Sequence, residues 1–415
     1  MLSAALLALA LTGGPPDLVE GEVLADVRIQ GNLVTSDEEV RRIAGIEIGM
    51  AIGPATIEEI GARLRAAKRF ERVEVLKRFA SIADPTRIAL VIIVDEGPVH
   101  IVRTGDPNRP TRVARNRGPG LLYLPLLERE DGYGLTYGAR VAWPNALGPR
   151  SRLSFPLTWG GNKRAAVELD KSFDRGLFSR ALAGASINRR ENPFFEVEDE
   201  RLRVWVRGER DVVRFVRAGA TGGWQRSDFL ESRQSLPFAG ADVTLDTRLD
   251  PVLPRNAVYG RASWERLGFS GRPTDRASVE GRGYVGLFGQ NTLVVRAVRE
   301  SANRSLPPAF KPLLGGMANL RGFRAGTDVG DTLIAGSLEL VAPLTSPLSI
   351  AKLGVSVFGD AGTVYNSGQR FADKPFKQSY GGSVWFTAAF VRVTLAVAHG
   401  VGSSTRVHFG GGVSF

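Results

Sequence analysis

The sequence predicts a mainly β protein: an antiparallel transmembrane β-barrel of 16 strands, preceded by one small α+β domain of order β-α-α-β-β. Three observations lead to this prediction. After residue 120 the chain repeats short runs in which apolar and polar residues alternate between turn residues, as barrel strands do. No run of about 18 or more apolar residues follows the amino terminus, which excludes spanning helices. The 415 residues also exceed one ordinary domain, so a second unit fits before the barrel.

The first element is a short apolar run at residues 2–11, followed by a Gly- and Pro-containing stretch. Its length suits the core of a secretory signal rather than a membrane span. No Lys or Arg precedes the run, so the positive leading region is missing. We expect residues 1–16 to be a signal segment, mainly because an outer-membrane barrel requires export.

The small domain is predicted over residues 22–98. Residues 23–29 alternate as a strand, and Thr35 or Ser36 caps a helix with acids in its first turn. A second helix follows Pro54 with apolar residues at helical spacing. The predicted strands that complete the domain are 72–79 and 87–94.

Residues 99–120 carry three prolines and several arginines and are interpreted as a linker. The barrel is predicted over 121–415, with eleven strands before a long connection at about 301–330 and five after it, an even total as bacterial barrels have. The last five are expected near 332–341, 350–362, 380–388, 390–398 and 406–415. The turns at 143–148 and 289–290 are tight and are placed on the periplasmic side. Longer connections at 189–200, 227–234 and 301–330 are placed outside.

The 301–330 connection is rich in Pro, Gly and Asn and contains Arg321. Long connections of this kind are usually functional or disordered. In the two strands that follow, alternation places Glu339 and Asp360 on the face that points away from lipid. A guanidinium that folded into the lumen could be held there by both carboxylates through charge-assisted hydrogen bonds.

These residues carry a family resemblance. Leu320-Arg321-Gly322-Phe323 resembles the Arg-Gly-Phe/Tyr motif of the sixth surface loop in the BamA/TamA-like outer-membrane assembly and secretion superfamily, and the segment 358–362 resembles its Phe-x-Asp-x-Gly strand motif. The small domain, which ends in Val-Asp-Glu-Gly-Pro, resembles a POTRA domain, the periplasmic module of that superfamily. The resemblance implies a protein of the cell outer membrane whose loop arginine reaches into the barrel. The expected lumen lock comprises Arg321, Gly322, Phe323, Glu339, Phe358, Asp360 and Gly362.

The final strand is the second candidate site. Val407 and Phe409 share one face with the terminal Phe415, while His408 lies on the other. A closing strand that ends in Phe resembles the carboxyl-terminal recognition signal of outer-membrane proteins. Three glycines interrupt this strand, and glycine weakens a strand, so a seam with the first strand is expected to be the weakest line of the barrel. Either this seam acts as a lateral gate or the glycines only ease curvature. The residues in question are Phe409, Gly410, Gly411, Gly412, Val413 and Phe415.

The strand at 72–79 is expected at an edge of the small domain, where free backbone groups can pair with an extended client segment. The alternative is an edge that its own charges protect, and the sequence leaves both open. The candidate docking residues are Arg72, Val73, Glu74, Val75, Leu76 and Lys77.

Composition excludes several function classes. The net charge of +11 comes from arginines that are scattered singly along strands rather than gathered in one patch, so no nucleic-acid binding is predicted. The absence of cysteine removes thiolate metal sites and cysteine nucleophiles. The three histidines, His100, His399 and His408, lie in a domain end, a loop approach and a lumen-facing strand position, whereas metal sites usually need several such ligands at close spacing. We therefore expect no enzyme, no metal and no cofactor.

The leading functional hypothesis is a factor that inserts β-barrel clients into the outer membrane, driven by strand pairing at the seam without nucleotide. Its expected partners are unfolded outer-membrane or secreted polypeptides, membrane lipid and lipopolysaccharide. The sequence identifies no other assembly subunit. The alternatives are a two-partner-type secretion pore for an exoprotein and, less favoured, a passive porin. A single POTRA-like domain and no room for a plug helix argue against the secretion pore.

Overall fold

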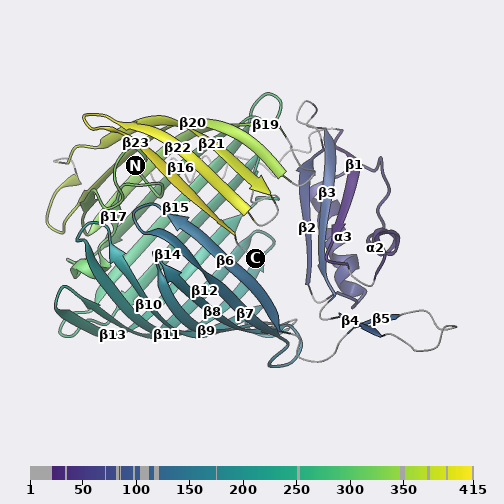
Figure 1. Cartoon of the computed structure of the whole chain (residues 1–415), viewed down its shortest axis with the longest axis horizontal. Coiled ribbons are helices and arrows are strands. Elements are labelled where there is room, and N and C mark those ends of the chain that lie inside the picture. Colours follow the sequence, from purple (N-terminus) through teal and green to yellow (C-terminus); the bar gives the residue numbers. More distant parts are fainter. Residues whose placement is uncertain are drawn as a thin grey trace.

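A computed structural model describes residues 21–32, 35–70, 72–80, 84, 86–96, 99–102, 112–115, 121–173, 175–249, 253–345, 351–371, 374–388 and 391–413. The segment expected to be a signal, residues 1–16, and the terminal Phe415 lie outside these residues. Figure 1 shows a barrel with the small amino-terminal domain beside one of its open ends. The predicted fold class is confirmed.

The amino-terminal domain has the predicted element order: β1 (Val23–Gln30), α2 (Asp37–Ala44), α3 (Pro54–Ala66), β2 (Arg72–Phe79) and β3 (Arg87–Asp95). Its sheet has the order β1-β3-β2, in which β1 runs parallel and β2 antiparallel to β3. Ser36 caps α2, since its side chain accepts a hydrogen bond from the Glu39 backbone N–H. As expected, β2 lies at an edge.

The core of this domain lies between the sheet and the two helices. The central strand β3 is apolar at almost every position, and its side chains are buried on both faces of the sheet. Its Ile88, Leu90 and Ile92 are fully buried against Ile60 and Leu64 of α3. Each such side chain contributes on the order of 2 kcal/mol of burial free energy.

The predicted linker contains regular structure. The strands β4 (Val99–Val102) and β5 (Arg112–Arg115) form a two-stranded antiparallel ribbon. The prediction gave too much weight to the prolines. Pro107 and Pro110 lie in sequence between the two strands, while both strand segments carry Val or Ile residues that favour extended backbone.

Sixteen antiparallel strands close the barrel, eleven before the long connection and five after it, as predicted. They are β6 (Leu122–Glu130), β7 (Gly134–Pro144), β8 (Ser151–Gly160), β9 (Lys163–Ser172), β10 (Arg180–Asn192), β11 (Val197–Val213), β12 (Val216–Phe229), β13 (Ser232–Asp246), β14 (Ala257–Leu267), β15 (Thr274–Gly286), β16 (Thr292–Ala302), β19 (Thr332–Thr345), β20 (Ala351–Tyr365), β21 (Lys377–Ala388), β22 (Val391–Gly400) and β23 (Thr405–Val413).

Side chains alternate between the outer surface and the lumen along these strands. Val357 and Val407 are 60% and 67% exposed, whereas the next residues, Phe358 and His408, are buried. An apolar exterior around a more polar interior is the pattern of barrels in lipid. Within the part of the chain that the structure describes, no helix combines the length and apolar character needed to cross a bilayer.

The predictions of two long loops are wrong. Residues 189–200 and 227–234 are mostly paired strand, with turns at only 193–196 and 230–231. Charged residues in these two segments form cross-strand ion pairs. Arg189 pairs with Glu200, and Arg233 donates to Asp228 at 2.7 Å. Such pairs stabilise strands that extend beyond an apolar band.

Candidate functional site

The neighbouring strands β19 and β20 place four functional side chains on one patch of the lumen wall. Ser337 lies directly opposite Asp360 in the ladder, and Glu339 lies directly opposite Phe358. Because side chains two residues apart share a face, all four point into the lumen. Leu338, between Ser337 and Glu339, and Val357, next to Phe358, point outward and are exposed.

Arg321 reaches this patch from the connection between β16 and β19, residues 303–331, here called the arginine loop. Its guanidinium donates two hydrogen bonds to Asp360, from Nε at 2.8 Å and from Nη2 at 2.7 Å. Nη1 donates to Glu339 at 2.8 Å, and Nη2 also donates to Ser337. The Arg321 backbone N–H donates to Asp360 as well, and Phe358 lies under the guanidinium, 3.3 Å from ring centroid to Cζ.

The lock is buried, which sets its energetics. The side chains of Arg321 and Asp360 are 11% and 2% exposed, and that of Glu339 is 24% exposed. A buried ion pair adds little net stability, but removing one partner leaves an uncompensated charge and costs about 3–5 kcal/mol. The bidentate geometry also fixes the direction of the arginine. The lock therefore sets the position of the loop.

Gly322 and Phe323 let the loop lie against the barrel wall. Gly322 has φ of 88°, and a Cβ there would be 2.9 Å from the Gly400 backbone nitrogen, so only glycine fits. Phe323 is buried with Leu314 and Leu320 in an apolar cluster. Gly362 lies against Leu314, whose Cδ1 is 2.8 Å from where a Cβ would be.

Asp331 holds the base of the arginine loop. It accepts hydrogen bonds from the backbone N–H groups of Leu306 and Ser367, each at 2.8 Å, and pairs with Lys311 at 3.2 Å. Burial alone would raise the pKa of this carboxyl, but the two N–H donors and Lys311 outweigh it and lower the pKa below its usual value. A depressed carboxyl pKa contributes stability that is present above the unfolded pKa and is lost as pH falls through the folded pKa.

We expect Asp331→Asn, which imitates the protonated carboxyl, to loosen the loop base at neutral pH. Hydrogen bonds to charged groups are worth about 1.5–3 kcal/mol, so trypsin cleavage after the exposed Arg304 should rise about tenfold or more. The wild-type loop should become equally labile to pepsin only below about pH 4. Asp328→Asn is the control, since Asp328 forms only a half-exposed pair with Lys377. Equal cleavage of Asp331→Asn and wild type would contradict this role.

The seam between the first and last barrel strands is paired over a short length. Among the described residues β23 pairs with β6 at three positions, Gly411↔Arg129, Gly412↔Glu128 and Val413↔Leu127, whereas β6 pairs with β7 at nine. The three glycines do not interrupt β23, which continues to Val413, so that expectation is wrong. At position 411 a Cβ would be 2.9 Å from a carbonyl oxygen of β22, so glycine is the residue that fits there.

The candidate docking residues of β2 lie near the barrel mouth. Figure 1 shows β2 as the strand of its sheet nearest to the barrel. Of the described strands only β3 pairs with β2, so its other edge is open. Arg72 pairs with Glu74 at 3.9 Å, and Lys77 pairs with Glu22. Both interpretations of this edge, docking and protection, fit these contacts.

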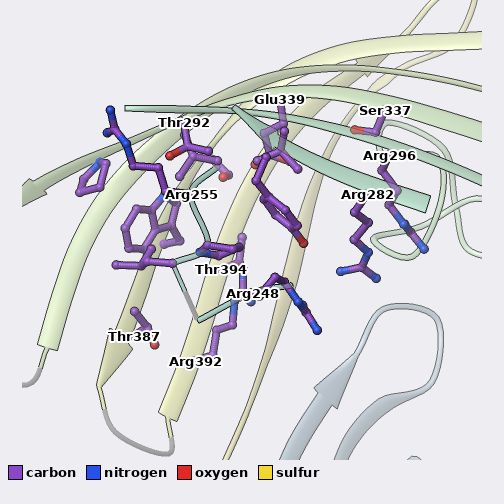
Figure 2. Close-up of a pocket in the computed structure, with 18 of the residues that line it drawn as sticks. Arg248, Arg255, Arg282, Thr292, Arg296, Ser337, Glu339, Thr387, Arg392 and Thr394 are labelled. Carbon is purple, nitrogen blue, oxygen red and sulfur yellow. The ribbon is translucent and has the colours of Figure 1, made fainter. Parts of the chain in front are cut away.

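A polar chamber of about 510 Å³ lies in the lumen between the lock and the amino-terminal domain. Phe79, at the end of β2, is part of its lining, and Arg255 lies over the Phe79 ring at 5.8 Å. Six arginines and two acids line the chamber, which makes it positive. Figure 2 shows five of these arginines around the same space: Arg248, Arg255, Arg282, Arg296 and Arg392.

Of the three candidate sites, the structure brings the lock and the seam together. The candidate docking residues of β2 lie apart from both. The Gly322 backbone N–H, next to the lock arginine, donates to His408 of β23 at 2.8 Å. The sequence analysis did not single out Asp131, Ser337 or the chamber arginines. For His408, the alternation in the last strand indicated a side chain that points into the lumen. For Asp131 the sequence gives no such indication, because it lies 277 residues away from the histidine it contacts.

Comparison with protein families gives two matches. The Omp85 superfamily domain matches residues 185–415, more than half of the chain. A POTRA family, described as a surface antigen variable number repeat, matches residues 23–97. No curated protein matches the sequence.

Solved structures share the fold at low sequence identity. BamA from Haemophilus ducreyi lacking POTRA domains 1–3 is 14% identical, with a TM-score of 0.63 over 94% of this chain and 84% of that one. CdiB from Escherichia coli is 10% identical, with a TM-score of 0.54 over 100% of this chain and 98% of that one. CdiB from Acinetobacter baumannii is 11% identical, with a TM-score of 0.50 over 100% and 97%.

Proposed function

The chain belongs to the Omp85 superfamily, and from that premise we propose that it inserts unfolded β-barrel polypeptides into the outer membrane through the seam between β6 and β23. As a member it is an outer-membrane assembly or secretion factor whose POTRA domain lies in the periplasm. The proposed activity is non-enzymatic and needs no nucleotide. Membrane lipid and lipopolysaccharide are proposed as contacts of the exterior.

The short seam is the observation that carries this proposal. Neighbouring barrel strands such as β10 and β11 pair over thirteen positions, while β23 and β6 pair over three in the described residues. Among the described residues, none of β23 pairs with the part of β6 before Leu127. Unpaired backbone N–H and C=O groups on a strand edge pair readily with another strand. A client strand therefore gains hydrogen bonds at this edge.

The lumen is a poorer route than the seam. The arginine loop occupies its outer part, where Arg321 is held by Asp360, Glu339 and Ser337. Passage through the lumen requires these buried contacts to break, which leaves the carboxylates of Asp360 and Glu339 in the lumen wall without the guanidinium. The open edge of β2 faces the barrel mouth and is proposed as the first docking point for an extended client.

Depletion of the protein followed by outer-membrane proteomics tests the proposed function. Pairing with the backbone of a client strand does not depend on the client's side chains. We therefore expect the amounts of many barrel proteins to decrease together, while the amounts of lipoproteins stay unchanged. Loss of a single secreted protein would instead indicate the second candidate, a two-partner-type secretion pore, whose fold CdiB shares. An unchanged outer-membrane proteome would reject both proposals.

A further inference from the structure

The outer half of the seam lacks backbone pairing. Residues 405–410 of β23 all have partners in β22, but none of them pairs with β6 among the described residues. At the same end of the barrel, β6 turns into β7 through residues 131–133. Side chains must therefore hold the two barrel edges together here.

A histidine and an aspartate bridge this gap. His408 of β23 lies with its Nδ1 2.7 Å from the Asp131 Oδ2 in the β6–β7 turn. The side chain of His408 is 2% exposed and that of Asp131 is 25% exposed, so the histidine is buried and the carboxylate is partly open to solvent. On the outer surface of the same seam, Arg129 of β6 lies over the Phe409 ring of β23 at 5.6 Å.

The hydrogen-bond partners of His408 determine which tautomer its imidazole adopts. The Gly322 backbone N–H can only donate, so His408 Nε2, 2.8 Å away, must accept. A neutral imidazole that accepts at Nε2 carries its proton on Nδ1, and this N–H donates to the Asp131 carboxylate. The single ring thus joins the arginine loop on one side to the first barrel hairpin on the other.

The arginine loop also contacts the first hairpin directly. The Met317 backbone N–H donates to Asp131 Oδ2 at 3.3 Å. Gly132, with φ of 86°, lies so close to the loop that a Cβ would be 2.4 Å from the Ala325 Cβ. The loop therefore rests on both edges of the seam at once.

We propose that Asp131 and His408 form a clasp that closes the outer half of the seam on the arginine loop, so that the loop and the seam open together. Consecutive backbone amides carry the coupling: the Arg321 N–H donates to Asp360 in the lock, and the Gly322 N–H donates to His408 in the clasp. A shift of this short segment breaks both contacts. Asp131 and His408 are positioning residues, and this role is independent of which client the protein handles.

Distance measurement between spin labels across the seam tests the clasp without any client. The chain has no cysteine, so two introduced cysteines are the only labelling sites. Val407→Cys on β23 and Tyr137→Cys on β7 place the labels at exposed positions on either side, 67% and 52% exposed. We expect one narrow distance for the wild-type seam in lipid vesicles. His408→Ala should add a second population, longer by at least one strand spacing, about 4.8 Å.

Matched variants separate the clasp from general damage. His399→Ala removes a histidine of β22 that contacts Thr405 in the same hairpin at 3.0 Å and the Tyr380 ring of β21 at 5.6 Å, and it should leave the distance unchanged. His408→Gln supplies one donor and one acceptor and should restore the narrow distance at least in part. Asp131→Ala should reproduce His408→Ala, and the double variant should add nothing further.

The coupling has its own readout. Arg321→Ala, which removes the lock contacts and leaves Asp131 and His408 in place, should produce the same longer population in the seam. An unchanged distance in His408→Ala, or an equal change in His399→Ala, would overturn the clasp. Opening by His408→Ala without opening by Arg321→Ala would overturn the coupling between loop and seam.

Discussion

Oxidation of the Glu128→Cys/Gly412→Cys variant is expected to stop client insertion, and reduction is expected to restore it. The two positions face each other in the β6–β23 ladder. Antiparallel partners have Cα separations of about 4.5–5.5 Å, within the range that a disulfide spans. Position 412 has room for a side chain, since its nearest neighbour would be 3.5 Å away, whereas at Gly411 a Cβ would be 2.9 Å from the Arg392 carbonyl oxygen. A covalent bridge here closes the edge that the client is proposed to use.

The measurement is the folding rate of a urea-unfolded barrel client in vesicles that contain the oxidised or reduced protein. We expect at least a tenfold fall on oxidation. The control is Ser263→Cys/Ser278→Cys, an opposed pair in the eleven-position ladder of β14 and β15. A disulfide there closes no seam and should leave the rate unchanged. Full activity of the oxidised seam variant would exclude the lateral route.

Loss of the buried lock is the second large effect. Asp360→Ala leaves the guanidinium in a buried site with Glu339 as its remaining carboxylate, and Arg321→Ala leaves two carboxylates facing one another. Either change costs about 3–5 kcal/mol, which corresponds to a hundredfold or larger rise in loop opening. The closed sixteen-strand ladder does not depend on these side chains, so we expect the barrel to stay folded while client insertion falls.

Trypsin cleavage after Arg324 reports the opening of the loop, because Arg324 lies three residues after Arg321 and is present in both variants. The control is Glu196→Ala, which removes only the surface partner of Arg324. Exposed pairs of this kind contribute about 0–1 kcal/mol, so cleavage should rise at most severalfold. Protection and insertion equal to wild type in both lock variants would show that the buried contacts do not position the loop.

Alternation and motif spacing were sufficient to predict the barrel and to single out Arg321, Glu339 and Asp360, but not Ser337, which also accepts a hydrogen bond from Arg321. Strand parity placed Glu339 and Asp360 on the lumen face, and the ladder sets them beside Ser337 and Phe358. The strand number also followed from alternation, because each strand of a barrel presents one face to lipid and one to the lumen.

Contacts between distant segments could not be predicted in this way. Residues 189–200 were predicted as a long connection, but most of them pair across the β10–β11 ladder, where Arg189 forms an ion pair with Glu200. The clasp joins Asp131 to His408, whose proximity exists only once the barrel closes. Neither residue has a local pattern that distinguishes it from an ordinary turn acid or a strand histidine.

The central claim is that a client meets the free edge of β6, and site-specific photo-crosslinking tests it most directly. A photoreactive phenylalanine derivative replaces Tyr123, which is 72% exposed on β6, and in separate variants Tyr259, whose ring lies under the chamber arginines Arg248 and Arg282, and Tyr380, 60% exposed on β21. During insertion we predict adducts with the client at position 123 and none at position 380. Adducts at position 259 without adducts at position 123 would place the client in the lumen and contradict the account.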